Sequence, residues 1–532
     1  MYTNDGFTAK ITDKVLNKRP QNTLKAQTRL YYTMPAPYNI MYNDRKIIMA
    51  KETNKKEKEI KQPSALLSIL PVVLLVAMLV QTVQAFGSNS LDGASQVTLL
   101  TVSAFCVFVG MVFLHVPWKN YEDAITKSIA SVASPLLILL MIGALSGAWM
   151  TSGVVPTLIY YGMKIISPQV FLASTCAICA LVSVMTGSSW TTVATIGIAL
   201  MGIGRAQGFS EGWIAGAIIS GAYFGDKISP LSDTTVLASG CAEVQLFDHI
   251  KYMLITTVPS ITITLIAFAV AGFVTTTSGV QDTEAFTTAL EARFNITPWL
   301  LVVPLCSSLM IMKRMPPLIT LFLSSMLAIV FGCIFQREAL NEINPDLFQA
   351  AMKCLYDSTA LSTDNALLSD LVQTNGMAGM MGTIWLIICA MCFGGAMTAG
   401  GFIAGITRIF TSFIKGRTSM VWAHATTGVM INVAIADQYL CILLSANMFR
   451  DIYDKGHFER RLLSRTTEDS VTVTSVLVPW NTCGMTQSTV LGVSTFTYLP
   501  YCFFNIISPL MSIFVAALGY KIFKVGSEEN KI

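Results

Sequence analysis

The sequence predicts an all-α polytopic membrane protein, and three observations support that prediction. Of the 532 residues, 53% are hydrophobic and 12% are charged, which is about half the charged share of a soluble domain. The mean hydropathy is +0.59, and apolar stretches long enough to cross a bilayer recur from residue 64 onward. A water-facing surface with so little charge could not shield this many apolar side chains, whereas a bilayer solvates them. A large soluble helical protein is therefore disfavoured.

The expected spans follow from the hydropathy along the chain. The clear apolar stretches are 64–86, 97–115, 132–150, 169–185, 250–276, 298–312, 317–335, 380–399, 419–436 and 502–523. Further apolar stretches are interrupted by Gly, Ser, Thr, Pro or Asp at 186–206, 212–240, 437–449 and 470–500. We therefore expect about 10–13 transmembrane segments, some of them incomplete.

The spans divide the chain into two apolar halves with polar tails and loops. The predicted parts are a polar, disordered cytoplasmic tail at 1–62, a first transmembrane repeat at 63–276, an external loop at 277–297, a second repeat at 298–525 that contains an external loop at 336–379, and a cytoplasmic tail at 526–532. Met49 resembles a natural start. We therefore expect residues 1–48 to be either an upstream extension or part of the disordered tail.

Basic residues set the expected orientation in a bacterial cytoplasmic membrane. Positively charged loops stay on the cytoplasmic side, and the basic positions are the lysines of 51–61, Lys119, Lys127, the run Arg450–Arg465, Lys521 and Lys524. The loops 277–297 and 336–379 carry more acidic than basic residues, so they are expected outside and both termini inside. Aromatic residues do not interleave with the N-terminal lysines, which disfavours nucleic-acid binding.

The cysteines and histidines do not indicate a metal, a cofactor or an enzyme. Two CxxC pairs, Cys176/Cys179 and Cys389/Cys392, lie inside apolar stretches, where small packing residues are the favoured interpretation. The four histidines are scattered and form no metal motif. The chain has no HExxH motif and no convincing nucleophile–base pair, so an intramembrane enzyme is disfavoured.

Two polar interruptions, one in each half, share an order of parts. The first contains TGSSWTT (186–192) and GAYFGDKISPLSDTT (221–235), and the second contains NVAIADQY (432–439) and SRTTEDSVTVTSVLVPWNTCG (464–484). A single shift along the chain places Pro230 on Pro479, Ser232 on Asn481, Asp233 on Thr482 and Ser188 on Asp437. Matched broken segments in two halves predict a repeat-built transporter with its site near the middle of the membrane.

The first interruption has the chemistry of a cation site. Pro230 lacks an N–H group and pushes Ser229 out of the helical region, so a helix would break there and free backbone carbonyls. Freed carbonyls, hydroxyls and a carboxylate suit Na⁺, which prefers oxygen ligands. The nearby hydroxyl candidates are Ser188, Ser189, Ser229, Ser232 and Thr234. The polar run at 186–192 is either a re-entrant ligand loop or ordinary polar contacts between helices.

Three carboxylates in apolar surroundings are candidates for binding Na⁺ or a proton. A charge at the centre of a membrane helix costs about 2.5–3.5 kcal/mol, which makes an ion role the default hypothesis. Asp226 could instead form a buried pair with its neighbour Lys227, whereas Asp233 has no adjacent base. Asp437 is either a third ion ligand or a polar packing contact.

Glu468 and Asp469 follow Arg465 and Thr466. For these two acidic residues the start of a helix, with Thr466 or Thr467 as its N-cap, is slightly favoured over a role in transport.

The sequence resembles the NhaC family of Na⁺/H⁺ antiporters over roughly residues 60–525. The segments that carry the resemblance are TGSSWTTVATIGIALMGIG (186–204), GAIISGAYFGDKISPLSDTTVLASG (216–240) and RTTEDSVTVTSVLVPWNTCG (465–484), supported by 141–162 and 490–510. The resemblance implies inverted repeats with paired re-entrant hairpins and elevator-like alternating access. It implies site positions at Asp226, Ser229, Asp233, Thr234, Pro479, Asn481 and Thr482, while Asp437 rests on the pattern alone.

The function expected from these features is exchange of Na⁺ for H⁺. Asp233, helped by Asp226 and Asp437, would bind either a proton or Na⁺, and the competition would couple the two ions. The alternative is an Na⁺- or H⁺-coupled carboxylate exchanger of the malate/lactate type, because the same family includes such carriers. An ion channel is a further alternative, disfavoured because two unlike broken repeats suit alternating access. The sequence leaves the oligomeric state open, a homodimer included.

Overall fold

The computed structural model describes residues 62–86, 93–274, 283–313, 315–361, 363, 368–369 and 372–525. By its internal contacts the chain forms two units, Met1–Lys61 and Gln62–Ile532, and the architecture below is that of the second unit. The predicted disordered tail up to residue 61, the expected non-native start and the tail at 526–532 lie outside the described residues.

The described residues are helical almost throughout. The helices of the first half are α4 Ala65–Phe86, α5 Ala94–Phe113, α6 Trp118–Ser131, α7 Ala133–Thr151, α8 Val154–Ile165, α9 Pro168–Thr186, α10 Ser189–Thr192, the π-helix η3 Val193–Gly197, α11 Ile198–Ala206, α12 Glu211–Ile228, α13 Asp233–Cys241 and α14 Leu246–Val274. Extended pairing in the same residues is limited to two isolated bridges, Thr359–Thr374 and Phe458–Lys524.

The second half begins with short helices and then repeats the pattern of the first. Its helices are α15 Thr283–Arg293, η4 Pro298–Leu301, α16 Val302–Met312, α17 Pro317–Phe335, α18 Arg337–Ile343, α19 Leu347–Tyr356, η5 Ala378–Met380, α21 Met381–Ala399, α22 Phe402–Thr411, α23 Arg417–Ile435, α24 Gln438–Lys455, α25 Arg460–Thr467, the π-helix η6 Glu468–Thr472, η7 Ser475–Leu477, α26 Thr482–Leu491, α27 Thr495–Tyr498, η8 Leu499–Tyr501 and α28 Phe503–Leu518.

Seven of the described helices are long and apolar enough to cross a membrane, and two bent pairs raise that number to nine. The seven are α4, α5, α7, α9, α14, α17 and the run of η5 and α21. Large apolar side chains such as Val258, Ile266 and Val270 of α14 are exposed, as expected for helices that face lipid. These features confirm an all-α polytopic membrane protein, and the polar hairpins and broken helices make up the incomplete crossings.

The two halves match at the shift that places Pro230 on Pro479. The same shift places α9, which begins at Pro168 and ends at Thr186, on α23, residue for residue from its first to its last position. The helical run from Ser189 to Ala206 corresponds in the same way to α24. α12 corresponds to the run that begins with α25 and ends with η7. The repeat suggested by a few polar residues is therefore a repeat of whole helices.

Each half contains a re-entrant hairpin. α9 runs inward to a turn at Gly187, and the run from α10 to α11 returns, so that the Gln207 amide nitrogen reaches the Ile166 carbonyl at 2.9 Å. In the second half α23 and α24 lie antiparallel, with the His424 ring bonded to the Tyr453 hydroxyl at 3.1 Å. The prediction of re-entrant hairpins is confirmed.

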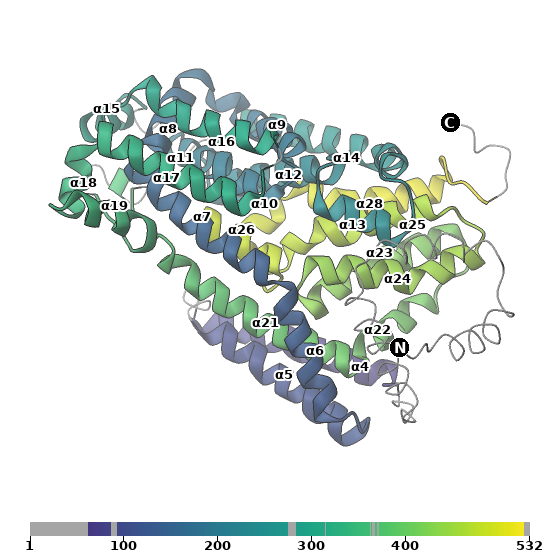
Figure 1. The fold of residues 1–532 in the computed structure, drawn as a ribbon. Helices are drawn as coiled ribbons and strands as arrows, with labels where there is room; N and C mark the ends of the chain where they lie inside the picture. The colour runs from purple at the N-terminus through teal and green to yellow at the C-terminus, as the bar shows by residue number, and fades with distance from the viewer. Residues whose placement is uncertain are drawn as a thin grey trace, which may run out of the picture. The chain divides into compact units, whose positions relative to one another are not determined.

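The two hairpins enter from opposite ends of the helical bundle. α9 begins beside the C-terminal end of α14, where Gly272 packs against the backbone of Gln169. α23 begins at the last turn of α28, to which Arg417 donates a hydrogen bond of 3.1 Å. That end of α28 lies at the start of α14, because the Tyr252 hydroxyl donates to the Lys521 carbonyl. The repeats are therefore inverted, and Figure 1 shows α8 and α15 at one end, with α22 and α25 at the other.

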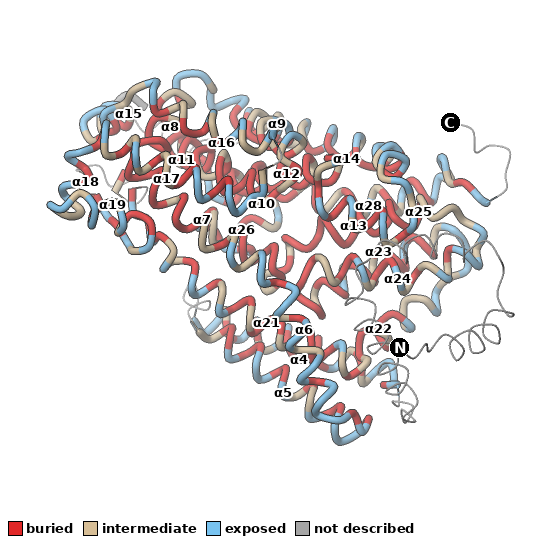
Figure 2. Tube along the Cα trace, in the orientation of Figure 1, coloured by how far each residue is buried: buried red, intermediate tan, exposed pale blue. Residues whose placement is uncertain are grey.

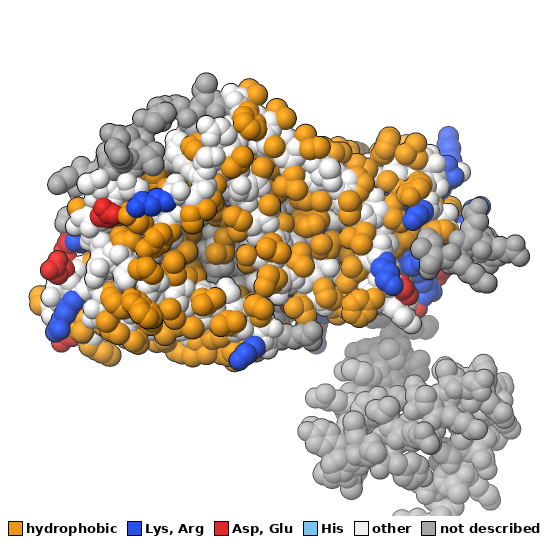
Figure 3. All heavy atoms as spheres, turned by 90° about the horizontal axis from the view of Figure 1, so that it is seen from above, with side chains coloured by type: hydrophobic (Ala, Val, Ile, Leu, Met, Phe, Trp, Pro, Cys, Tyr) orange, Lys and Arg blue, Asp and Glu red, His pale blue; other side chains and the backbone are white. Residues whose placement is uncertain are grey.

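Burial and charge follow this arrangement. The helices around the hairpin tips, such as α12 and α26, are largely buried, whereas α4 and α5 alternate between buried and exposed positions (Figure 2). In the face shown in Figure 3, hydrophobic side chains cover the middle, and charged side chains gather mainly at the two ends. One of these ends carries an ion pair between Arg293 and Glu342, which joins the two loops predicted to be external. The other carries Glu243, paired with Arg450 and Arg460.

Candidate functional site

The tips of the two hairpins have the same backbone geometry. Gly187 ends α9 in the left-handed region with φ of 67°, and the hydroxyl of Ser188 then caps α10 by accepting from the Thr191 N–H. In the second hairpin Ala436 has φ of 64°, and Asp437 caps α24 by accepting from the Leu440 N–H at 2.8 Å. The match of Ser188 with Asp437, predicted from the shift, is thus a match of two helix caps.

Each hairpin is followed by a helix that breaks at a proline. α12 ends at Ile228, and α13 begins at Asp233 with the Ser232 hydroxyl as its cap. Between them the Ser229 hydroxyl donates to the Val184 carbonyl of the hairpin at 2.8 Å. In the second half Asn481 caps α26 in the corresponding place. The breaks at Pro230 and Pro479 form as predicted.

A cavity of about 730 Å³ lies where the first hairpin tip meets the first break. Its lining includes Asp226 at the end of α12, Asp233 with Thr234 at the start of α13, and the hairpin residues Thr186, Gly187, Ser188, Trp190 and Thr191. Gln438 and Tyr439, the first residues of α24, reach the same cavity from the second half. The structure therefore brings both carboxylates of the first interruption together with residues from the tip of the other hairpin.

The two cavity carboxylates have different surroundings. Asp226 is 7% exposed, and one of its oxygens accepts hydrogen bonds from the Ser189 backbone N–H (3.1 Å) and the Ser189 hydroxyl (2.7 Å). Asp233 is exposed and stands at the N-terminus of α13, where the helix dipole favours negative charge. The Thr234 hydroxyl is bonded to Ser232 at 2.9 Å. Asp226 is thus held in place by the first hairpin, and Asp233 borders the open part of the cavity.

The residues predicted in the second interruption lie elsewhere. Asn481 and Thr482 form the start of α26, and the Thr482 N–H donates to the Ala436 carbonyl at 2.8 Å. Pro479 lines a separate cavity of about 390 Å³, whose described lining includes no Asp or Glu. The Asp437 carboxylate is used as a helix cap, and Asp437 is not among the residues that line the cavity of Asp226. These four residues support the second hairpin rather than the carboxylate cavity.

Gln438 and Tyr439 are cavity residues of the second half that the sequence prediction missed. Gln438 corresponds to Ser189 in the repeat, and its amide donates to the Ser475 hydroxyl at 3.1 Å. Ser475 is itself the counterpart of Asp226, so the contact between Ser189 and Asp226 recurs as a contact between amide and hydroxyl. The shift between the two halves could have found Gln438 and Tyr439 if it had been applied to every residue of the hairpin instead of to the most polar ones.

Lys227 does not pair with Asp226, so the alternative of a buried pair between these two neighbours was wrong. Its ammonium forms an ion pair with Asp469 of η6 and donates to the Ser508 hydroxyl at 2.9 Å. Neighbouring residues of an α-helix point about 100° apart, so Lys227 faces away from the cavity that Asp226 lines. Asp226 is therefore held by Ser189, and Lys227 binds α12 to the second half.

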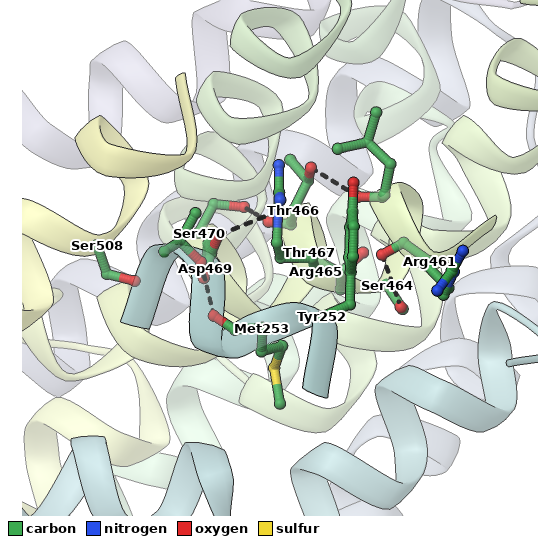
Figure 4. A network of polar contacts seen from close by, with 12 residues as sticks. Tyr252, Met253, Arg461, Ser464, Arg465, Thr466, Thr467, Asp469, Ser470 and Ser508 are labelled. Carbon is green, nitrogen blue, oxygen red and sulfur yellow. Dashed lines mark hydrogen bonds and ion pairs between the residues drawn. The ribbon is translucent and has the colours of Figure 1, made fainter. Parts of the chain in front are cut away.

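Glu468 and Asp469 do not start a helix, and that prediction was also wrong. The helix begins earlier, at Arg460, and passes without interruption from α25 into the π-helical segment η6. Both carboxylates are completely buried. Asp469 accepts from Lys227 and from the Thr256 hydroxyl (3.0 Å), and its second oxygen lies 3.9 Å from Arg465. Figure 4 shows Arg465, Asp469 and Tyr252 in this cluster.

The hairpin tips allow a matched prediction on stability. We expect Gly187→Ala to destabilise the protein by about 2 kcal/mol or more, because a left-handed residue with a Cβ costs about 1–2 kcal/mol and the new Cβ would crowd Leu231. That Cβ would lie 2.6 Å from the Cβ of Leu231. Ala436→Gly is expected to stabilise it by about 0.5–1 kcal/mol, since strain is relieved against a smaller entropy cost. Thermal denaturation in detergent measures both, and equal shifts of the same sign would contradict the assignment.

Comparison with known proteins was made on the whole chain. A family model described as the Na⁺/H⁺ antiporter family matches residues 23–222 and again 221–520. A curated Na⁺/H⁺ antiporter NhaC from Alkalihalophilus pseudofirmus is 38% identical over 429 residues, covering 80% of this chain and 91% of that protein. The NhaC protein of Bacillus subtilis is 34% identical, covering 78% and 91%. A malate-2H⁺/Na⁺-lactate antiporter of Bacillus subtilis is 33% identical, covering 87% and 96%.

Proposed function

The chain belongs to the Na⁺/H⁺ antiporter family, and from that membership we propose that it exchanges Na⁺ for H⁺ across the bacterial cytoplasmic membrane. The observation that supports this most is the cavity that Asp226 and Asp233 share at the tip of a re-entrant hairpin. Carboxylates, hydroxyls and helix ends are the groups that suit Na⁺ at membrane depth.

Competition for the carboxylates couples the two ions. A protonated carboxyl has lost the charge that attracts Na⁺, and a carboxylate holding Na⁺ resists protonation. Asp226 supplies the buried charge, and exposed Asp233 and buried Thr234 supply further oxygen atoms in the lining of the same cavity. One site that holds one ion at a time and is exposed alternately to each side produces exchange.

The basic residues indicate which end of the helical bundle faces the cytoplasm. We propose that the end carrying Arg450, Arg460 and Lys521 is cytoplasmic and that the loops joined by Arg293 and Glu342 are external. Both termini then lie inside, because α4 starts beside α22, where Arg408 donates to the Pro63 carbonyl. Residues from the tips of both inverted hairpins line one cavity, which suits alternating access.

Replacing Asp233 with Asn tests the role of the cavity in exchange. We expect Na⁺-driven proton movement in proteoliposomes, followed with a pH-sensitive dye, to fall about 10-fold, because the loss of one charged contact is worth about 1.4 kcal/mol of Na⁺ binding. Exposed Asp248 of α14, which is not among the residues that line the cavity, serves as the control. Exchange by Asp233→Asn equal to that of Asp248→Asn would reject Asp233 as an ion ligand.

The same vesicles separate ion exchange from carboxylate exchange. The described lining of the Asp226 cavity includes no Lys or Arg, Lys227 is bound by Asp469, and Arg465 is completely buried. A carboxylate substrate would therefore find no cationic partner in this cavity. We expect added malate or lactate to leave Na⁺-driven proton movement unchanged, and stimulation by either acid would favour the carboxylate exchanger.

A further inference from the structure

Glu468 is a completely buried carboxylate to which the proposed cavity mechanism assigns no role. Among the residues that the structure describes, no group makes a hydrogen bond of ordinary geometry to either of its oxygens, although the Thr472 hydroxyl one turn further along interacts with it. It stands at the start of η6, and π-helical turns inside longer helices are frequent at functional sites. A buried charge without a partner is costly, so this position needs an explanation beyond packing.

The charges around Glu468 do not balance. Lys227 and Arg465 are the two buried cations of the cluster, and Asp226, Glu468 and Asp469 are its three buried carboxylates. With every group ionised, the cluster carries one excess negative charge. Buried charges must be compensated, so the cluster requires one further monovalent cation.

Arg465 strengthens the case that the cluster is built for charge. Its guanidinium lies over the Tyr252 ring, 4.5 Å from the centroid, and its three nitrogens make no hydrogen bond within the described residues. Its nearest printed anionic contact is the Asp469 oxygen at 3.9 Å. A fixed guanidinium that is not neutralised by close hydrogen bonding provides a standing positive field for the carboxylates beside it.

Gln438 links the cluster to the cavity. Its amide donates to the Thr472 carbonyl at 2.9 Å, and Gln438 itself lines the cavity of Asp226. The Thr472 hydroxyl interacts with Glu468 in turn. A chain of polar groups therefore connects the cavity, through the tip of the second hairpin, with the unpartnered carboxylate.

Most of the elements that pack around Glu468 contribute a titratable or charged group. They are Asp226 and Lys227 of α12, Asp233 of α13, His249 and Tyr252 of α14, His424 of α23, Tyr439, Cys441 and Tyr453 of α24, Arg465 of α25 and Asp469 of η6 itself, whereas α28 contributes the hydroxyl of Ser508. The two histidines bond to hydroxyls of Ser464, Tyr453 and Ser445. Both cations of the cluster are engaged with Asp469, so within the described residues Glu468 has no close cation.

We propose that Glu468 carries the transported proton, apart from the cavity carboxylates that hold Na⁺. With a proton on Glu468 the cluster is neutral, since the two cations, Lys227 and Arg465, balance the charges of Asp226 and Asp469. When Glu468 releases its proton, one Na⁺ at Asp226 restores neutrality. The two ions therefore exclude each other through charge balance, one for one, without sharing a ligand. The inference rests on the proposed Na⁺/H⁺ exchange, and in place of competition for one carboxylate it couples the two ions through the charge balance between Glu468 and Asp226.

The test measures two activities of the full-length protein in the same proteoliposomes. Na⁺-driven proton movement reports coupled exchange, and exchange of internal Na⁺ for radioactive external Na⁺ reports the Na⁺ site alone. For Glu468→Gln we expect proton movement to fall about 100-fold, the low end of what a positioned proton-transfer group contributes. Sodium-for-sodium exchange should fall as well, because an uncharged side chain at position 468 mimics the protonated state, in which Na⁺ at Asp226 would leave an uncompensated positive charge. Exposed Glu338, changed to Gln, is the matched control.

Each outcome decides the assignment. Wild-type rates of either activity in Glu468→Gln would overturn it. So would loss of sodium-for-sodium exchange in Glu468→Asp, which keeps the charge, because that loss would indicate a structural role. If Glu468→Gln fails to fold, Glu468→Asp is used, and coupled exchange with a displaced pH profile is expected; an unchanged profile would overturn the inference. Absence of Na⁺-driven proton movement by the wild-type protein would instead overturn the proposed function itself.

Discussion

Replacing Asp226 with Asn is expected to abolish Na⁺/H⁺ exchange while leaving the protein folded. The carboxylate lines the cavity, and one oxygen accepts two hydrogen bonds from Ser189. The amide oxygen of Asn can accept the same two bonds, so the hairpin tip remains anchored. Only the charge is lost, which we expect to weaken Na⁺ binding by about 3 kcal/mol, or about 100-fold.

Two measurements distinguish the loss of charge from a loss of structure. Sodium-for-sodium exchange by Asp226→Asn should fall together with Na⁺-driven proton movement, and the temperature of thermal denaturation in detergent should shift little. Ser189→Ala is the complementary variant: it removes one hydrogen bond to Asp226 but keeps the charge, so exchange should be reduced and not abolished. Undiminished exchange by Asp226→Asn would exclude Asp226 from the ion site.

The helices could be predicted from short stretches of sequence, because hydropathy, proline and glycine act on the residues next to them. The apolar run 317–335 coincides with α17. α12 ends at Ile228, two residues before Pro230, because a proline has no N–H to continue the hydrogen bonds of the helix. Gly187 ends α9 for the same kind of local reason, a left-handed turn that glycine allows. α6 was missed because its charged and polar residues hide an amphipathic helix from a search for apolar runs.

Contacts between distant segments were not predictable in the same way. Lys227 was compared with its neighbour Asp226, but its partner Asp469 is 242 residues away. The pairing depends on how α12 packs between α14 and α28, and no local pattern reports it. The shift between the two halves did carry long-range information, since it paired the hairpin tips correctly. The shift did not predict which chemical group stands at each position of the second half, because corresponding positions such as Asp226 and Ser475 carry different groups.

Breaking the ion pair between Lys227 and Asp469 is expected to have the largest effect on stability. Both side chains are completely buried, and the pair joins α12 to η6 with further bonds from Thr256 of α14 and Ser508 of α28. Lys227→Met removes the cation and leaves Asp469 in the interior beside Arg465 alone. Loss of one partner of a buried pair costs about 3–5 kcal/mol, so we expect a large fall in the denaturation temperature and in the yield of folded protein.

The double variant Lys227→Met with Asp469→Asn is expected to recover most of that loss. It has no uncompensated charge at this pair, and Asn can still accept the hydrogen bond from Thr256. The coupling between the two substitutions in a double-mutant cycle is therefore predicted to be favourable by about 1–3 kcal/mol. Additive effects of the single changes would show that the two charges do not stabilise each other, and Glu468 would then have access to the cation that this structure assigns to Asp469.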